Sequence, residues 1–183
     1  MQSLSRDHVD ISTEVLHPES LAEKKYDFAI SFGYRHILGR ECIEVLQGNI
    51  LNIHISLLPW NKGSDPNIWS WLENTPKGVS IHWVTESFDS GDIALQKSVS
   101  LNPEDDLIST YEDLITEAAF LFHLLWNDIG ILNAQREKQN GAGSTHRRGD
   151  LKIHEKALTS GLQTKCKDLM EYGRSNNLWV NFD

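Results

Sequence analysis

The order of the apolar segments predicts an α/β fold with a mainly parallel sheet. Residues 26–32 are an apolar run of strand length, residues 39–47 suggest a short amphipathic helix, and residues 48–51 end a second apolar strand. A strand, a helix and a strand in this order give a parallel pair joined by a crossover. Apolar residues then recur at spacings of three and four over residues 107–126, which predicts the longest helix and a stripe that packs on the core.

The remaining segments complete the expected order of elements. Residues 20–25 are assigned to the end of a helix or to the loop that follows it. A helix over residues 66–73 should begin with Asp65 as its N-cap and a proline at its first position. Further extended segments are expected at residues 78–84 and 93–101, on either side of a turn-rich stretch.

Length and charge narrow the function classes. The chain has 183 residues, enough for one domain with a real core, and its formal net charge is −9, which argues against a nucleic-acid surface as the main partner. Cys42 and Cys166 are far apart and lack the spacing of metal ligands, so both are interpreted as reduced residues of a cytoplasmic protein. The start lacks an apolar signal region, and no stretch approaches about 18 apolar residues, so neither secretion nor a membrane span is expected.

Asn52 and His54 are the first candidates for chemistry. They stand where a strand runs out into a loop, and because side chains alternate across a strand, both point to the same side. The turn-rich stretch that follows, residues 88–92, contributes a carboxylate. These three groups suit acyl-type transfer, since an amide can hold an oxyanion while an imidazole moves a proton. A structural role is the alternative, because an Asn at a strand end can satisfy a turn and a buried His is often only hydrogen-bonded.

Three motifs make the sequence recognisable. Asn-Ile-His-Ile-Ser-Leu-Leu-Pro at residues 52–59, Gly-Val-Ser-Ile-His at residues 78–82 and Phe-Asp-Ser-Gly-Asp at residues 88–92 resemble the signature of the folate-dependent formyltransferases. Residues 58–67 and 75–78 most resemble the members of that family that formylate amino sugars carried on a nucleotide. The resemblance implies a Rossmann-like formyltransferase fold.

The resemblance also implies how the chain is divided. Residues 1–132 correspond to the formyltransferase catalytic domain, and residues 133–183 to a loop and a short C-terminal extension. The family normally begins with a strand and a helix that are missing from this sequence. Without them, Phe28, Ile30 and Phe32 should be partly exposed, the chain should be prone to form homo-oligomers or aggregates, and its formyl transfer should be weak.

By this resemblance, the reaction moves a formyl group from N10-formyltetrahydrofolate to the amine of a nucleotide-linked 4-amino-4,6-dideoxy sugar, with dTDP as the expected nucleotide. Asn52 and a protonated His54 would stabilise the oxyanion. Asp89 would raise the pKa of His54 and take part in proton removal. No metal is expected.

The resemblance further suggests ligand contacts. The pterin ring of the folate should meet the loop after the first strand, together with Asp92; the loop residues are Tyr34, Arg35, His36, Ile37 and Leu38. The nucleotide sugar should contact four residues: Trp60, Asn61, Lys62 and His82. Core packing or solvation is the alternative for most of these side chains. The basic cluster over residues 145–149 either approaches the acceptor or forms a solvated loop.

Other functions stay open. Methionyl-tRNA formyltransferases resemble the sequence too, but they carry an additional basic C-terminal domain, whereas this chain is acidic and only a short segment follows Trp126. Glycinamide ribonucleotide formyltransferases are disfavoured by Trp60 and Asn61. From a different class, the chain could be a non-catalytic remnant that binds folate or a partner.

Overall fold

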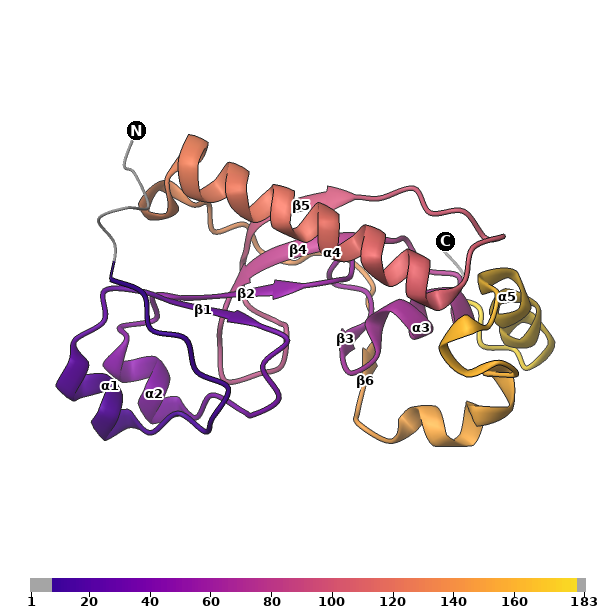
Figure 1. Ribbon diagram of the computed structural model, residues 1–183, viewed down its shortest axis with the longest axis horizontal. Helices are drawn as coiled ribbons and strands as arrows, with labels where there is room; N and C mark the ends of the chain where they lie inside the picture. The colour runs from indigo at the N-terminus through magenta and orange to yellow at the C-terminus, as the bar shows by residue number, and fades with distance from the viewer. Residues whose placement is uncertain (1–7, 181–183) are drawn as a thin grey trace.

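The computed structural model describes residues 8–180 and arranges them around one central sheet (Figure 1). The sheet has four strands in the spatial order β1 (Ala29–Phe32), β2 (Ile50–His54), β4 (Gly78–Trp83) and β5 (Ile93–Ser98). Two short helices, α1 (Pro18–Lys24) and α2 (Arg40–Val45), lie beside β1 and β2, and the long helix α4 (Leu107–His123) crosses the opposite face. The predicted α/β class is confirmed.

Successive side chains of β2 point to opposite faces of the sheet and so pack against different helices. Ile50 is fully buried in the cluster formed with α1 and α2, whereas Leu51 is fully buried in the cluster that includes the apolar stripe of α4. Ile53 packs on the α4 side as well. Asn52 and His54 therefore share the face of Ile50, away from α4, because successive side chains of a strand point to opposite faces.

The strand pairing is more antiparallel than the sequence predicts. β1 and β2 pair in parallel, as the strand–helix–strand order requires, but β2 with β4 and β4 with β5 are antiparallel. The helix between β2 and β4, α3 (Pro66–Leu72), packs on a C-terminal helix rather than across the sheet. The chain therefore re-enters the sheet beside β2 at the same end where β2 finishes, and β4 runs in the opposite direction.

A second apolar core lies beyond the end of the sheet. It combines α3, the start of α4 and the C-terminal helix α5 (Cys166–Ser175), which carry Trp69, Leu72, Leu107 and Leu169 into one cluster. A two-stranded parallel sheet closes this region, with β3 (Lys62–Gly63) paired to β6 (Thr145–His146). The described part of the expected extension, residues 133–180, thus packs on the part of the chain that follows β2.

The helices start and end where the local sequence favours it. Asp106 caps α4, because its Oδ1 accepts the backbone N–H of Ser109 at 2.9 Å. The helix continues as a π-helix over Leu124–Ile129 until Gly130 takes a positive φ of 81°. Asp65 stands at the N-cap of α3, as expected, but its side chain makes no capping hydrogen bond.

Short 3₁₀ segments follow α4 at Ile131–Asn133, Asp150–Ala157 and Gly161–Gln163. Among the described helices, none is long and apolar enough to cross a membrane.

Strand β1 forms one border of the described sheet. Ile30 is 39% exposed and Phe32 is 50% exposed, as expected for an uncovered strand, whereas Phe28 packs edge-on against Trp83 with ring centroids 5.9 Å apart. Phe32 also lines the large cavity described below.

Candidate active site

A large cavity opens where β1 and β2 end. Its volume is about 880 Å³, and its walls come from the loop after β1, the end of β2, the residues around the start of α3 and the loop between β4 and β5. Carboxyl ends of parallel strands are the usual place for ligands in α/β sheets. The size falls within the range of pockets that hold small molecules and cofactors.

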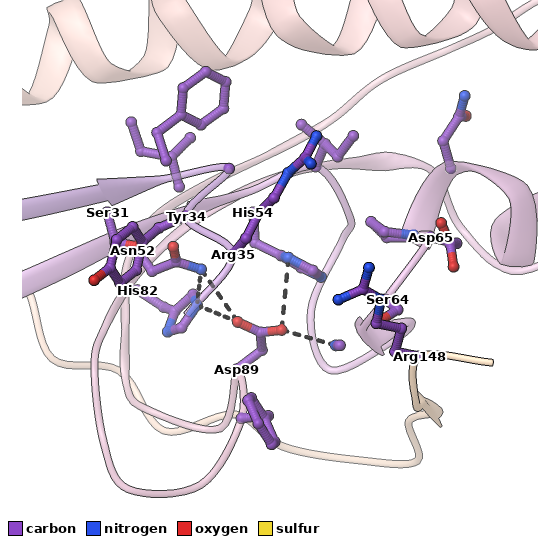
Figure 2. A pocket seen from close by; sticks show the side chains of 18 of the residues that line it. Ser31, Tyr34, Arg35, Asn52, His54, Ser64, Asp65, His82, Asp89 and Arg148 are labelled. Carbon is purple, nitrogen blue, oxygen red and sulfur yellow. Dashed lines mark hydrogen bonds and ion pairs between the residues drawn. The ribbon is translucent and has the colours of Figure 1, made fainter. Parts of the chain in front are cut away.

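Four polar side chains meet at the base of this cavity (Figure 2). Strand register brings two of them together, because Asn52 of β2 is the direct partner of His82 of β4. Asn52 Nδ2 lies 3.1 Å from both His82 Nε2 and Asp89 Oδ1, and His82 Nε2 is 3.2 Å from the same carboxylate oxygen. His54 Nδ1 lies 3.7 Å from Asp89 Oδ2.

Carbonyl partners fix one proton on each imidazole. His54 Nε2 lies 2.9 Å from the backbone oxygen of Asn61, and His82 Nδ1 lies 3.0 Å from that of Trp83. Since a carbonyl only accepts hydrogen bonds, both of these ring nitrogens carry a proton. The neutral form of His54 therefore has its lone pair on Nδ1, the nitrogen nearer to Asp89.

Burial and charge act against each other at His54. Burial lowers the pKa of His54 below its usual value of 6.5, and although the negative charge of Asp89 raises it, the net shift is downward. The sequence predicted a raised pKa and a protonated ring. The sign of the Asp89 effect was right, but the desolvation of a residue that is only 7% exposed outweighs it.

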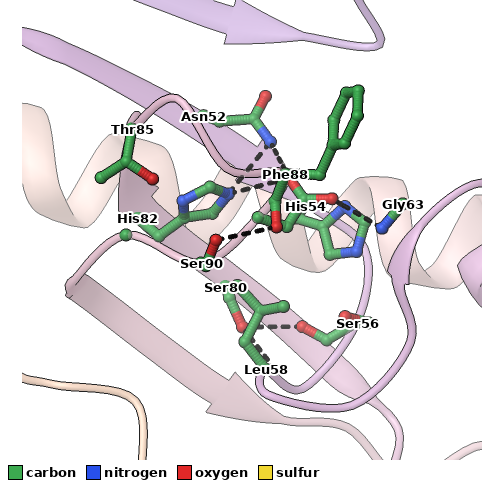
Figure 3. Close-up of polar contacts among 12 residues, drawn as sticks. Asn52, His54, Ser56, Leu58, Gly63, Ser80, His82, Thr85, Phe88 and Ser90 are labelled. Atoms are coloured by element: carbon green, nitrogen blue, oxygen red, sulfur yellow. Dashed lines mark hydrogen bonds and ion pairs between the residues drawn. The ribbon is translucent and has the colours of Figure 1, made fainter. Parts of the chain in front are cut away.

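Asp89 stays ionised although it is largely buried. Burial alone would raise the pKa of Asp89, but the hydrogen bond with His82, the charge of His54 and the backbone N–H of Gly63 together hold the pKa well below its usual range. Gly63 N donates to Asp89 Oδ2 at 2.8 Å (Figure 3). The carboxylate is thus held by groups from β3, β4 and β2, and it brings a permanent negative charge to His54.

Gly63 combines this donor role with close packing that admits no side chain. Its φ is +85°, and a Cβ there would lie 2.2 Å from the carbonyl oxygen of His146. Gly63→Ala should lower the free energy of unfolding by about 1–3 kcal/mol and reduce turnover, because the anchor of Asp89 moves. Gly141→Ala is the matched control, since Gly141 has a similar φ of +87° with no atom within 4 Å of its Cβ position. Equal denaturation midpoints for the two variants would contradict the packing argument.

The cavity collects most of the residues that the sequence singled out. Asn52, His54, His82 and Asp89 form its base, and the whole loop expected to meet the pterin lines one wall: Tyr34, Arg35, His36, Ile37 and Leu38. The Tyr34 hydroxyl donates to the backbone oxygen of Glu14 and accepts from Leu16 N, so the ring rather than the hydroxyl is offered to a ligand.

Four expected ligand contacts lie elsewhere. Asp92 is outside the cavity lining and pairs with Lys138 at 2.8 Å. Trp60, Asn61 and Lys62 are also outside it, and Asn61 is fully buried, so its side chain has no surface for a ligand. A loop sequence cannot show which of its residues will reach a cavity, and here these four residues lie outside the lining.

The sequence interpretation missed several cavity residues. Arg148 lines the wall beside Ser64 and Asp65 (Figure 2). Tyr111 of α4 and Leu162 of the C-terminal segment also line the cavity. The available signal was the basic cluster over residues 145–149, which left contact with the acceptor open. The structure places one arginine of that cluster, Arg148, in the cavity wall, and Arg147 outside the lining.

Comparison with known proteins supplies the family. Residues 12–122 match the model of the formyl transferase family. The chain is 36% identical to the formyltransferase PseJ from Anoxybacillus kamchatkensis, solved in complex with UDP-4,6-dideoxy-4-formamido-L-AltNAc and tetrahydrofolate, covering 88% of this chain and 86% of that one with a TM-score of 0.83. A 4-N formyltransferase from Francisella tularensis is 26% identical, with 75% and 57% covered and a TM-score of 0.67.

Curated relatives include methionyl-tRNA formyltransferases. That of Desulforamulus reducens is 29% identical, over 88% of this chain and 50% of its own length, and that of Thermodesulfovibrio yellowstonii is 35% identical, over 52% and 31%. The chain therefore spans half or less of the length of these relatives. The family match covers more than half of the chain and includes Asn52, His54, His82 and Asp89. The chain belongs to the formyl transferase family.

Proposed function

We propose that this chain transfers a formyl group from N10-formyltetrahydrofolate to the amine of a nucleotide-linked 4-amino-4,6-dideoxy sugar. One observation carries the proposal: Asn52, His54 and Asp89 lie together at the base of a single cavity. The walls of that cavity differ, as described below, and each suits one of the two substrates. The likeness to PseJ, whose complex holds a formamido sugar nucleotide and tetrahydrofolate, supports this pairing of ligands. The nucleotide in that complex is UDP, so UDP joins dTDP as a candidate carrier.

The proposed chemistry starts from neutral His54. The amine nitrogen attacks the formyl carbon, and the electron pair of the C=O bond moves to the oxygen, where Asn52 Nδ2 donates a hydrogen bond. His54 Nδ1 takes a proton from the amine, and Asp89 stabilises the resulting imidazolium. The oxyanion then collapses, the bond from carbon to N10 breaks, and N10 takes the proton from His54. The products are the formamido sugar and tetrahydrofolate.

One wall of the cavity suits the folate. Large apolar side chains stand exposed around its rim, with Phe32 at 50%, Ile37 at 71% and Phe88 at 62%. Exposed apolar groups gathered at a cavity mark a binding surface rather than ordinary solvent exposure. A flat pterin ring lying between them would cover this surface, while the backbone of the loop after β1 supplies fixed donors and acceptors.

The other wall suits the nucleotide sugar. Arg148 lies there beside Ser64 and Asp65, within the same cavity as His54 (Figure 2). A guanidinium is the side chain best suited to bind a diphosphate, because it offers several donors in one plane. We therefore assign Arg148 to the diphosphate of the acceptor.

Replacing this arginine should weaken acceptor binding selectively. Arg148→Gln should raise the KM for the nucleotide sugar by about tenfold to a hundredfold, the scale of a lost charge-assisted hydrogen bond, and leave the KM for the folate unchanged. Steady-state kinetics with each substrate varied in turn would measure both values. Arg147→Gln removes the same charge one residue away, outside the cavity lining, and should leave both values unchanged. Equal effects of the two variants would contradict the assignment.

Product analysis tests the reaction itself. The purified chain is incubated with N10-formyltetrahydrofolate and, in separate reactions, UDP- and dTDP-linked 4-amino-4,6-dideoxy sugars or methionyl-tRNA, and the formylated product is identified by mass spectrometry. Formamido sugar is the expected product. The tRNA arm is included because methionyl-tRNA formyltransferases are among the relatives, although a net charge of −9 disfavours a polyanionic acceptor. Folate binding without turnover of any acceptor would instead favour a non-catalytic role.

A further inference from the structure

A buried polar cluster lies around Asn61, in the loop after β2, outside the cavity lining. We call it the Glu73 cluster; its members are Asn61, Glu73, Thr75, Ser144 and His146. None of these side chains is exposed: Asn61 and Thr75 are at most 1% accessible, and the side chains of Glu73 and His146 are 12% and 9% accessible. None of the five lines the cavity.

The cluster satisfies every polar atom of the Asn61 side chain. Asn61 Oδ1 accepts from the Thr75 hydroxyl at 2.7 Å, and Asn61 Nδ2 donates to Glu73 Oε2 at 3.1 Å and to Ser144 Oγ at 3.3 Å. Ser144 Oγ accepts from Asn61 N at 3.0 Å and donates to Glu73 Oε2 at 2.7 Å. Asn61 is thereby held in a left-handed conformation, with φ of +55°, that non-glycine residues seldom adopt.

Glu73 is the hub of the cluster, and a carboxylate fits its partners better than an amide. Its Oε2 accepts two hydrogen bonds, and its Oε1 faces His146 Nε2 at 3.1 Å, in a contact too bent to count as a hydrogen bond. His146 is itself held by stacking on Trp69, with ring centroids 3.8 Å apart. Two donors meet at Oε2, so that position requires an acceptor oxygen, and a glutamine can supply one there only by turning its NH₂ group toward the His146 ring.

The cluster reaches the chemistry through a single backbone group. The carbonyl oxygen of Asn61 accepts the Nε2 proton of His54, which leaves the lone pair on Nδ1, the nitrogen that faces Asp89. If Asn61 moved, the other tautomer of His54 would become accessible, and its lone pair would point away from the cavity. The orientation of the base therefore depends on how firmly Asn61 is held.

We propose that Glu73 is a positioning residue for the transfer reaction, and that it acts through Asn61 by selecting the Nε2-protonated tautomer of His54. The inference rests on the proposed function for its kinetic part. It also assigns a positioning task to the C-terminal segment, because Ser144 and His146 complete the cluster. The same segment forms the β3–β6 pair, in which Lys62 N donates to Ser144 O at 2.9 Å next to the Gly63 anchor of Asp89.

Substitution of Glu73 tests the proposal by kinetics. Glu73→Gln should lower kcat by about tenfold to a hundredfold, the scale expected when a catalytic group is misplaced, with both KM values nearly unchanged. Glu112→Gln, on the exposed face of α4, is the matched control and should leave kcat unchanged. Thr75→Val, which removes the hydroxyl that donates to Asn61 Oδ1, should act in the same direction and serves if Glu73→Gln fails to fold.

A double-variant cycle separates positioning from general destabilisation. If Glu73 acts through His54, then Glu73→Gln should cause no further loss of kcat in a His54→Ala background, because the two effects are not independent. A multiplicative loss in the double variant would overturn the proposal, as would an unchanged kcat in the Glu73→Gln single variant.

A substrate-free readout keeps this test distinct from that of the proposed function. In the folded protein, ¹⁵N chemical shifts of the His54 ring report the tautomer, and they should indicate a proton on Nε2. In Glu73→Gln and Thr75→Val the two ring shifts should move toward each other as the tautomers mix, while Glu112→Gln should leave them in place. Unchanged His54 shifts in both cluster variants would refute the positioning role even if no acceptor had yet been turned over.

Discussion

His54→Ala and Asn52→Ala should each lower kcat by about 10²- to 10³-fold, the usual scale for losing an oxyanion donor or a general base. The two side chains share one face of β2 at the base of the cavity, where an attacking amine and a formyl group can reach both. Neither substitution removes a large apolar side chain from the core, so the fold should persist. Single-turnover kinetics with the nucleotide sugar and the formyl folate would measure the loss.

The control for this experiment is His123→Ala. His123 is exposed at the end of α4, away from the cavity lining, and its ring hydrogen-bonds to Asn127, so its removal should not change kcat. Circular dichroism of all three variants would check that they fold. Turnover within about threefold of the wild type in His54→Ala would be far from the expected loss and would rule out His54 as the base.

The base of the cavity shows what alternation along one strand can predict. Asn52 and His54 are two residues apart on β2, so their common face follows from the strand assignment alone. Asp89 lies more than 30 residues farther on, and no spacing rule places it beside His54; the resemblance to a family identified it. His82 lies opposite Asn52 because β2 and β4 pair in an antiparallel register. The sequence predicted a mainly parallel sheet, from which this register could not be obtained.

Residues that depend on long-range packing were not accessible to sequence reasoning. Glu73 and Ser144 meet across 71 residues, and Arg148 reaches the cavity from a segment expected to be an extension. The pKa of His54 is a second example. Opposite charge and burial shift it in opposite directions, and the outcome depends on how fully the ring is buried, which a sequence does not give.

Asp89→Asn should have the second large effect, and it tests the balance of charge and burial directly. The carboxylate opposes the lowering of the His54 pKa, so removing its charge should lower that pKa further. Neutral His54 would then persist to lower pH, and the acidic limb of the kcat profile should move to lower pH. At every pH, however, the imidazolium formed during transfer would lose its counter-charge, so kcat should fall by about 10²- to 10⁴-fold.

Hydrogen-bond geometry adds to this loss. In the wild type, one carboxylate oxygen faces Asn52 Nδ2 and His82 Nε2, and the other accepts from Gly63 N. An asparagine has a single acceptor oxygen, so its NH₂ group must face donors on one side, and the loop that carries it should lose order. Asp113→Asn, on the exposed face of α4, removes the same charge away from the cavity and should change neither kcat nor its pH dependence. Measuring kcat between pH 4 and 9 for both variants tests whether the charge of Asp89 acts on His54. If the acidic limb of the Asp89→Asn profile stays in place or moves to higher pH, the charge of Asp89 does not act on His54.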